Sequence, residues 1–116
     1  REPEAPVFDK AGLLVRVMDD GDLARVAVEA FLDDIPRQMH ALQESLDAGD
    51  VAVTERQAHT IKGASASVGA ERLRAVASEM EQAAKARDLG AVQARMADLE
   101  RQFDALKGAM EQHLAL

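Results

Sequence analysis

The sequence predicts an all-α fold: an antiparallel up-down-up-down four-helix bundle with a short additional helix near the N-terminus. The composition favours helix, because 23 of the 116 residues are alanine and much of the rest is Leu, Glu, Arg, Gln and Met. β-branched residues never alternate with polar ones as they do in a half-buried strand. Four long segments carry an apolar stripe at helical spacing, and the short connections between them make consecutive helices antiparallel.

The first element is expected to be short. Residues 1–7 are charged and contain two prolines, so we expect a linker or arm there, followed by a single domain over residues 8–116. Asp9 is suited to cap the start of a helix. That helix is expected to carry Leu13, Leu14, Val17 and Met18.

Two Gly-Asp pairs bound the longest predicted helix. Gly suits the left-handed residue that ends one helix and Asp suits the N-cap of the next, so Gly21-Asp22 and Gly49-Asp50 mark its ends. Pro36 is expected to bend this helix without ending it, because the apolar stripe resumes in phase afterwards. The expected stripe consists of Leu23, Val26, Ala27, Ala30, Phe31, Ile35, Met39, Leu42 and Leu46.

Three further helices complete the bundle. One is expected over residues 51–68, ending at Gly69, and the next begins near Glu71 with Leu73, Val76, Ala77, Met80 and Ala84 facing inward. Asp88 is the expected cap of a single last helix. Its apolar residues alternate in spacing between three and four, as in a heptad seam: Leu89, Val92, Met96, Leu99, Phe103, Leu106 and Met110.

The composition excludes several classes of function. The absence of cysteine removes disulfides, thiolate metal sites and cysteine nucleophiles. The lack of Trp and Tyr leaves little for base stacking, and a net charge of −7 argues against nucleic acid as a partner. No apolar run approaches the ~20 residues that span a bilayer, and the first residues lack the apolar stretch of a signal peptide, so we expect no direct membrane contact.

His59 is the residue that the pattern singles out. On a helical wheel at 100° per residue, the apolar and small residues of its helix lie on the far side from the imidazole, which therefore points to solvent. That buried side consists of Thr54, Ile61, Ser65 and Val68. The other histidines, His40 and His113, have no evident partner set, and we interpret them as ordinary surface residues.

The neighbours of His59 strengthen a functional interpretation. Lys62 and Gly63 follow at the two spacings whose side chains meet on a helix surface. Gly63 costs about 1 kcal/mol relative to Ala in a helix interior, but it leaves space beside the imidazole for another protein to approach. Lys62 would offer an ammonium to anionic oxygens, and Arg56 and Glu55 are interpreted as solvated charges that could tune the site. The patch is expected to be locally basic.

The residues that follow His59 resemble the signature of a known family. The run from His59 to Ala70, His-Thr-Ile-Lys-Gly-Ala-Ser-Ala-Ser-Val-Gly-Ala, strongly resembles the signature of histidine-containing phosphotransfer (HPt) domains. The pattern His-x-x-Lys-Gly-x-Ser with a later Gly fits at every defining position, and the helix layout fits from about residue 8 to 114. Residues 31–36 and the turn at 48–50 are similar to HPt modules at the C-terminal end of bacterial hybrid sensor histidine kinases.

The resemblance implies a phosphorelay carrier in two-component signal transduction. His59 would accept a phosphoryl group from the aspartyl phosphate of a response-regulator receiver domain and pass it to another receiver. Lys62 would help to hold the phosphorylated state, Gly63 would give steric access, and Ser65 would pack inside the helix. Gly69 is the later glycine of the motif. Some members use a glutamine or a basic residue on the next helix, where this chain offers Glu81, Gln82 and Lys85 without a basis for choosing.

The same resemblance defines what the chain lacks. No cofactor is expected, because the Mg²⁺ ion and acidic pocket needed for transfer would belong to the receiver. Nothing fits a Walker or kinase pattern, so neither ATP binding nor autokinase activity is expected. Kinase domains of the same polypeptide are possible partners, and the expected location is the cytoplasm, including the cytoplasmic part of a membrane-bound sensor kinase.

Three alternatives stay open. A metal-binding bundle would place Glu55 and His59 on one face, but it lacks the paired Glu-x-x-His motifs of di-iron bundles. A non-catalytic helical adaptor bundle would explain the heptad seam but not the combination of His, Lys and Gly. The phosphoacceptor domain of a chemotaxis-type kinase carries the same motif, and it receives its phosphoryl group from ATP through a kinase domain.

Overall fold

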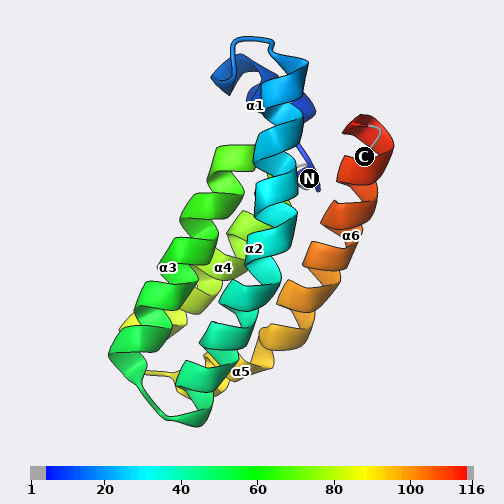
Figure 1. Cartoon of the computed structure of the whole chain (residues 1–116). Helices are drawn as coiled ribbons and strands as arrows, with labels where there is room; N and C mark the ends of the chain where they lie inside the picture. Colours follow the sequence, from blue (N-terminus) through cyan, green and yellow to red (C-terminus); the bar gives the residue numbers. More distant parts are fainter. Residues whose placement is uncertain (1–4, 115–116) are drawn as a thin grey trace, which may run out of the picture.

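A computed structural model of the chain describes residues 5–114 and contains six helices in that range. They are α1 (Lys10–Arg16), α2 (Gly21–Asp47), α3 (Val51–Val68), α4 (Glu71–Lys85), α5 (Leu89–Ala94) and α6 (Met96–Leu114). The described part of the chain has no strand. The long helices α2, α3, α4 and α6 form the antiparallel bundle, and α1 lies across one of its ends (Figure 1). The predicted fold class is confirmed.

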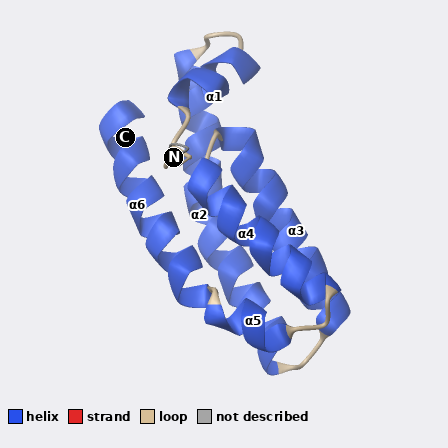
Figure 2. Ribbon diagram, turned by 180° about the vertical axis from the view of Figure 1, so that it is seen from behind, coloured by secondary structure: helices blue, strands red, loops and turns tan. Residues whose placement is uncertain are grey.

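The two ends of the described chain lie at the same end of the bundle, as both views show (Figures 1 and 2). Lys10 Nζ donates a hydrogen bond to the carbonyl oxygen of His113 at 3.0 Å. The rings of Phe8 and His113 also pack together, with centroids 6.3 Å apart. Ala5 is fixed as well, because its carbonyl accepts from Arg72 Nε at 2.7 Å. Residues 1–4 of the expected arm lie outside the described residues, as do residues 115 and 116 of the expected domain.

One apolar core runs along the bundle axis. Buried residues of α2 recur at heptad-like spacing and meet the predicted inward faces of α3 and α4. The largest fully buried side chains are Leu13, Ile35, Leu42, Ile61, Leu73, Met80, Leu99, Leu106 and Met110. α2 passes through Pro36 as one continuous helix, as the unbroken phase of its stripe predicts.

The capping predictions are largely confirmed. Asp9, Asp50 and Asp88 each accept a hydrogen bond from a backbone N–H in the first turn of the helix that they precede. The prediction for Gly21-Asp22 is wrong, because Asp20 caps α2 and Gly21 is already helical. The left-handed residues of that turn are Met18 and Asp19, with φ of 54° and 61°. Met18 lies beyond the end of α1 and is 90% exposed.

The start of the α2 stripe is also corrected. Leu23 and Val26, expected in the core, are 49% and 62% exposed, whereas Ala24 and Val28 are fully buried. The buried seam that begins at Ala24 continues in phase through Phe31 and Ile35. Residues one or two positions from Ala24 lie 100–200° around the helix from this seam, so they face outward. Bulk misled the prediction here, because the larger side chains lie on the outer face.

The last predicted helix is two helices. The chain tightens at Arg95, whose backbone N–H bonds to the carbonyl of Val92 only three residues back. Arg95 Nη1 also forms an ion pair with Glu79 of α4 at 2.9 Å. The predicted apolar seam continues from α5 into α6 across the break at Arg95, because all of its residues from Val92 onward are buried: Val92, Met96, Leu99, Phe103, Leu106 and Met110.

Gly69 connects the end of α3 to the N-terminal segment. It has φ of 77° and closes α3 in the left-handed conformation, as predicted. Its carbonyl accepts from the backbone N–H of Asp9 at 2.8 Å. A Cβ at this position would lie 2.6 Å from the carbonyl oxygen of Asp9. Glycine is therefore required both by the turn and by the chain that crosses it.

Within residues 5–114, no helix is both long and apolar enough to cross a membrane.

Candidate functional site

The site is centred on His59, on the outer face of α3. The residues predicted for the inner face of this helix, Thr54, Ile61, Ser65 and Val68, are all buried. Their burial fixes the rotation of α3, and the side chain of His59 is left 65% exposed. The prediction of an exposed imidazole is therefore confirmed.

The imidazole is held by a carboxylate of the next helix. Nδ1 of His59 lies 2.7 Å from Oε2 of Glu81, and Glu81 comes from α4 with a side chain only 4% exposed. The other carboxylate oxygen, Oε1, lies 2.5 Å from Nζ of Lys62. Lys85, one turn further along α4, places its ammonium 3.9 Å from Oε2. One buried anion is thus shared among an imidazole and two ammonium groups.

The electrostatics of this cluster keep Glu81 ionised. Burial alone raises the pKa of the Glu81 carboxyl, but the contacts with Lys62 and His59 outweigh burial and lower that pKa below its usual value. An ionised carboxylate only accepts hydrogen bonds. The short contact therefore assigns the ring proton to Nδ1, which donates to Glu81.

Nε2 of His59 is the free nitrogen. In the tautomer that Glu81 selects, Nε2 carries the lone pair, and it has no hydrogen-bond partner among residues 5–114. An exposed, uncommitted imidazole nitrogen is a nucleophile that another protein can reach.

The sequence left the role of Glu81 unassigned among three candidates, and the structure separates them. Gln82 is exposed, and Lys85 reaches only the outer edge of the cluster. A signal for Glu81 was present, because it follows Ala77 by four residues and precedes Ala84 by three, within the buried stripe of α4. A carboxylate at a core position needs a partner, and that requirement points to the basic face of the adjacent helix.

The surroundings of His59 differ in one respect from the expected basic patch. Lys62 was expected to offer a free ammonium, but its side chain is 29% exposed and its charge is paired with Glu81. Arg56 is exposed, and its backbone carbonyl accepts a hydrogen bond from Thr60 Oγ1 at 3.0 Å. The positive charges around the ring are therefore balanced in part by a buried negative one.

Gly63 leaves an open space beside the imidazole. A Cβ built at this position meets no atom within 4 Å, so the packing of the chain does not require glycine here. Ser65 is fully buried and donates to the carbonyl of Ile61 at 2.7 Å, as its inward position predicts. Ser65 and Gly69 shape α3, while Gly63 affects only its outer surface.

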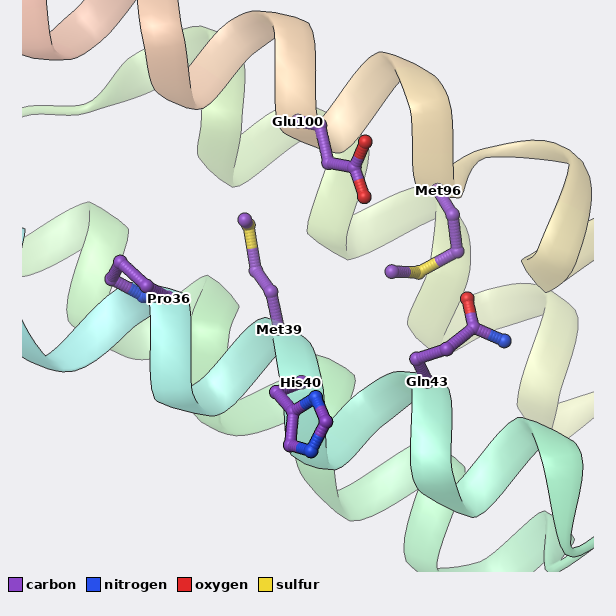
Figure 3. Close-up of a pocket in the computed structure, with 6 residues that line it drawn as sticks. All are labelled: Pro36, Met39, His40, Gln43, Met96 and Glu100. Atoms are coloured by element: carbon purple, nitrogen blue, oxygen red, sulfur yellow. The ribbon is translucent and has the colours of Figure 1, made fainter.

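The other histidines lie elsewhere. His40 Nε2 lies 3.3 Å from Oε1 of Glu44 on the exposed side of α2. A pocket of about 290 Å³ lies between α2 and α6, and there Met39, Met96 and Glu100 point into the cleft while the ring of His40 points away from it (Figure 3). No group of three or more His, Asp or Glu residues in the described chain could hold a metal ion.

The fold and the site together define a class of protein: a four-helix bundle with an accessible histidine that is oriented by a buried carboxylate. The family model described as Hpt domain matches residues 26–114. The comparison with curated protein sequences gives no match.

Two solved structures are similar over nearly the whole chain. Histidine-containing phosphotransfer protein B (HptB) of Pseudomonas aeruginosa PAO1 is 27% identical, with a TM-score of 0.87 and 97% of both chains covered. The HPT domain of a sensor hybrid histidine kinase from Shewanella is 21% identical, with a TM-score of 0.77 and 94% of both chains covered, and this likeness shows the shared fold.

The chain therefore belongs to the Hpt domain family. It is a phosphorelay carrier of two-component signalling, and proteins of this family carry phosphoryl groups rather than act as kinases.

Proposed function

We propose that His59 is the phosphoacceptor, which receives a phosphoryl group from the aspartyl phosphate of one receiver domain and passes it to another. One observation carries this proposal: Nδ1 of His59 is bonded to Glu81, whereas Nε2 faces solvent without a partner among residues 5–114. The nitrogen with the available lone pair is thus the one that a partner protein can reach.

The transfer is a displacement at phosphorus. Nε2 attacks the phosphorus atom, the N–P bond forms, and the P–O bond to the aspartyl group breaks, so that the aspartate leaves as a carboxylate. The bundle supplies the nucleophile, and the proposal assigns the acidic pocket and its Mg²⁺ ion to the receiver. No cofactor is assigned to the bundle itself.

The neighbouring residues support docking and charge. Gly63 allows the receiver backbone close to the ring, because nothing in the chain occupies the space of its missing Cβ. Lys62 lies near the phosphoryl position and would share its charge between Glu81 and the phosphoryl oxygens. Arg56, one turn before His59, supplies a further exposed cation to the receiver surface.

The cellular setting follows from the partner. Receiver domains are the proposed partners, together with kinase domains of the same polypeptide where the module is part of a longer kinase. The proposed location is the cytoplasm, either free or in the cytoplasmic part of a membrane-bound sensor kinase. Neither nucleic acid nor a membrane surface is a proposed ligand, and ATP alone is expected to leave the protein unlabelled.

A transfer assay tests the proposal. The protein is incubated with a receiver domain that carries a radiolabelled aspartyl phosphate, and label that is acid-labile and stable to alkali is quantified. We expect the label on the wild type and its loss in His59→Gln. His40→Gln is the matched control, because His40 is also exposed on a helix but pairs only with Glu44. Equal labelling of His59→Gln and the wild type would overturn the assignment.

A further inference from the structure

We propose that a groove beside His59, between the start of α3 and the turn after α4, selects receivers with carboxylates in a matching position, and that Arg87 is the residue in this groove that determines the selection. The proposal rests on the proposed function of His59 and concerns which receivers the bundle accepts. Three features support it: the place of the groove, the distribution of charge and the backbone conformation of Arg87.

The groove begins next to the imidazole. It has a volume of about 450 Å³ and is lined by Val51, Ala52, Glu55, Ala84, Lys85 and Arg87. The ammonium of Lys85 lies 3.9 Å from Oε2 of Glu81, and the same oxygen lies 2.7 Å from Nδ1 of His59. Glu55 lies one turn before His59 on α3. A receiver is a whole domain, so one that places its aspartyl phosphate at Nε2 also covers a groove this close.

The charge of the chain is unevenly distributed around the bundle. Residues 50–88, which form α3, α4 and the turns that flank them, carry six Lys and Arg residues and six Asp and Glu residues, so their net charge is zero. The whole net charge of −7 therefore lies in the rest of the chain. Of the six carboxylates, Asp50 and Asp88 accept hydrogen bonds from backbone N–H groups and Glu81 is buried. This helix pair is thus less repulsive to an acidic partner than the rest of the bundle is.

A receiver has negative charge at this point for a chemical reason. Mg²⁺ in proteins that act on phosphoryl groups is held by carboxylates, and the proposed function assigns such a site to the receiver. Lys85 and Arg87 line the groove with positive charge where that partner docks. Glu55 is the one carboxylate in the lining, and it would repel a carboxylate placed against it. The groove therefore favours receivers whose carboxylates lie opposite the two cations.

The backbone at Arg87 is a separate reason to assign this residue a role. Four helices end with the same hydrogen-bond pattern, in which one N–H bonds three residues back and the next N–H bonds five residues back. The first residue of each pair is left-handed: Met18, Gly49, Gly69 and Arg87, with φ of 54°, 67°, 77° and 60°. A residue with a Cβ is strained in this conformation and glycine is not.

The strain at Arg87 is not compensated by a contact of its side chain. Arg87 is exposed and forms no ion pair or hydrogen bond through its guanidinium group with any residue from 5 to 114. The fold would therefore gain from glycine at this position, as it has at the ends of α2 and α3. An exposed guanidinium that lines a groove beside the imidazole is suited to a carboxylate of the partner instead.

The test uses a substitution that removes the charge and relieves the backbone together. Arg87→Gly should unfold at the same temperature as the wild type or higher. Transfer from the phosphorylated receiver that labels wild-type His59 is then measured at low ionic strength over a range of receiver concentrations. We expect the half-saturating concentration to rise about threefold to fivefold at an unchanged limiting rate, because an exposed ion pair contributes to docking and not to the displacement at phosphorus. Arg87→Lys, which keeps the charge, should restore most of the wild-type value.

The matched control removes the same charge elsewhere. Arg101 is exposed on α6 and pairs with Asp98, so Arg101→Gln should leave the half-saturating concentration unchanged. High salt should abolish the difference between the wild type and Arg87→Gly, because it screens exposed charges. An unchanged half-saturating concentration in Arg87→Gly, an equal rise in Arg101→Gln, or a fall in the limiting rate alone would each overturn the proposal. If Arg87→Gly does not fold, Arg87→Asn takes its place, since asparagine also tolerates the left-handed conformation.

The two proposals fail in different ways. A wild-type protein that no phosphorylated receiver labels would refute the proposed function, and the selection of receivers with it. A wild-type protein that is labelled on His59, with the same half-saturating concentration in Arg87→Gly, would refute only the role of Arg87 and its groove.

Discussion

Nδ1 of His59 lies 2.7 Å from Oε2 of Glu81, so an exposed ring on α3 is oriented by a buried carboxylate of α4. The two residues are 22 positions apart in the sequence and meet only because α3 and α4 pack antiparallel. The two nitrogens of the ring therefore have different surroundings. The nucleophilic Nε2 is accessible to a partner protein, while the carboxylate that holds the proton on Nδ1 is shielded from water.

Gly63 provides the clearest test of access. Gly63→Leu should preserve the fold and slow transfer from a receiver by about tenfold or more, equivalent to roughly 1.4 kcal/mol in the barrier. Gly108→Leu is the matched control, since Gly108 is also exposed inside a helix and its Cβ would also meet nothing within 4 Å. Both changes replace a poor helix former, so thermal unfolding should shift upward by similar amounts. Equal transfer rates in the two variants would contradict the access role.

Glu81 should be costly to function and not to stability. Glu81→Met places an apolar side chain in the apolar stripe of α4, and the cations that it leaves unpaired, Lys62 and Lys85, have side chains 29% and 51% exposed and can be hydrated instead of staying buried without a partner. We expect the free energy of unfolding in urea to stay within about 1 kcal/mol of the wild type or to rise. Glu81→Ala is the contrasting variant, because it also leaves a cavity. A loss of several kcal/mol in Glu81→Met would show that the pair stabilises the fold.

The same carboxylate predicts part of the acid sensitivity. The pKa of Glu81 is lower in the folded chain than in the unfolded one, so the folded state binds fewer protons at this group. Its contribution to stability is therefore present above the unfolded pKa, about 4.3 for a glutamate, and is lost as pH falls through the folded pKa. Urea unfolding from neutral to strongly acidic pH should show a steeper loss for the wild type than for Glu81→Gln. Parallel curves for the two proteins would contradict the shift.

Gly69 and Gly49 allow two effects of adding a side chain at positive φ to be measured separately: the strain of the backbone conformation and the clash with a neighbouring segment. Both residues are left-handed, with φ of 77° and 67°, but a Cβ at Gly69 would meet the backbone of Asp9 and a Cβ at Gly49 would meet nothing. Gly49→Ala should cost about 1–2 kcal/mol from the backbone conformation alone. Gly69→Ala should cost roughly 1–3 kcal/mol more, because the N-terminal segment must shift. Equal losses in urea unfolding would show that the contact with Asp9 relaxes freely.

Much of the fold could be predicted because it depends on local signals. The bounds of α3 and the start of α4 follow from Asp50, Gly69 and the apolar period, and these predictions are confirmed. The errors lie where local signals conflict with packing. Leu23 and Val26 are large enough to suggest a core, but the smaller Ala24 and Val28 are the residues that face it. The break at Arg95 leaves the heptad spacing unchanged, so the spacing could not reveal it.

The site divides in the same way. The exposed position of His59 follows from the inner face of its own helix, and the structure confirms it. The pairing with Glu81 required the rotation and distance of a second helix, which no pattern within residues 51–68 specifies. The sequence did place the Glu81 carboxylate among the buried residues of α4. A buried carboxylate needs a partner, but the sequence did not identify which residue that partner is.

Buried alanines on α3 and α4 also affect how close these two helices lie, and therefore whether Glu81 reaches His59. Ala58 on α3 and Ala77 and Ala84 on α4 are at most 1% exposed, and α3 makes its most extensive contacts with α4. Small side chains allow two helix backbones to approach closely, and a glutamate side chain spans only a short gap. The distance between these two helices thus decides whether Glu81 can reach His59, and so it controls the reactivity of the imidazole. A methyl group too many in this layer would leave the histidine exposed but separate it from the carboxylate that holds its proton.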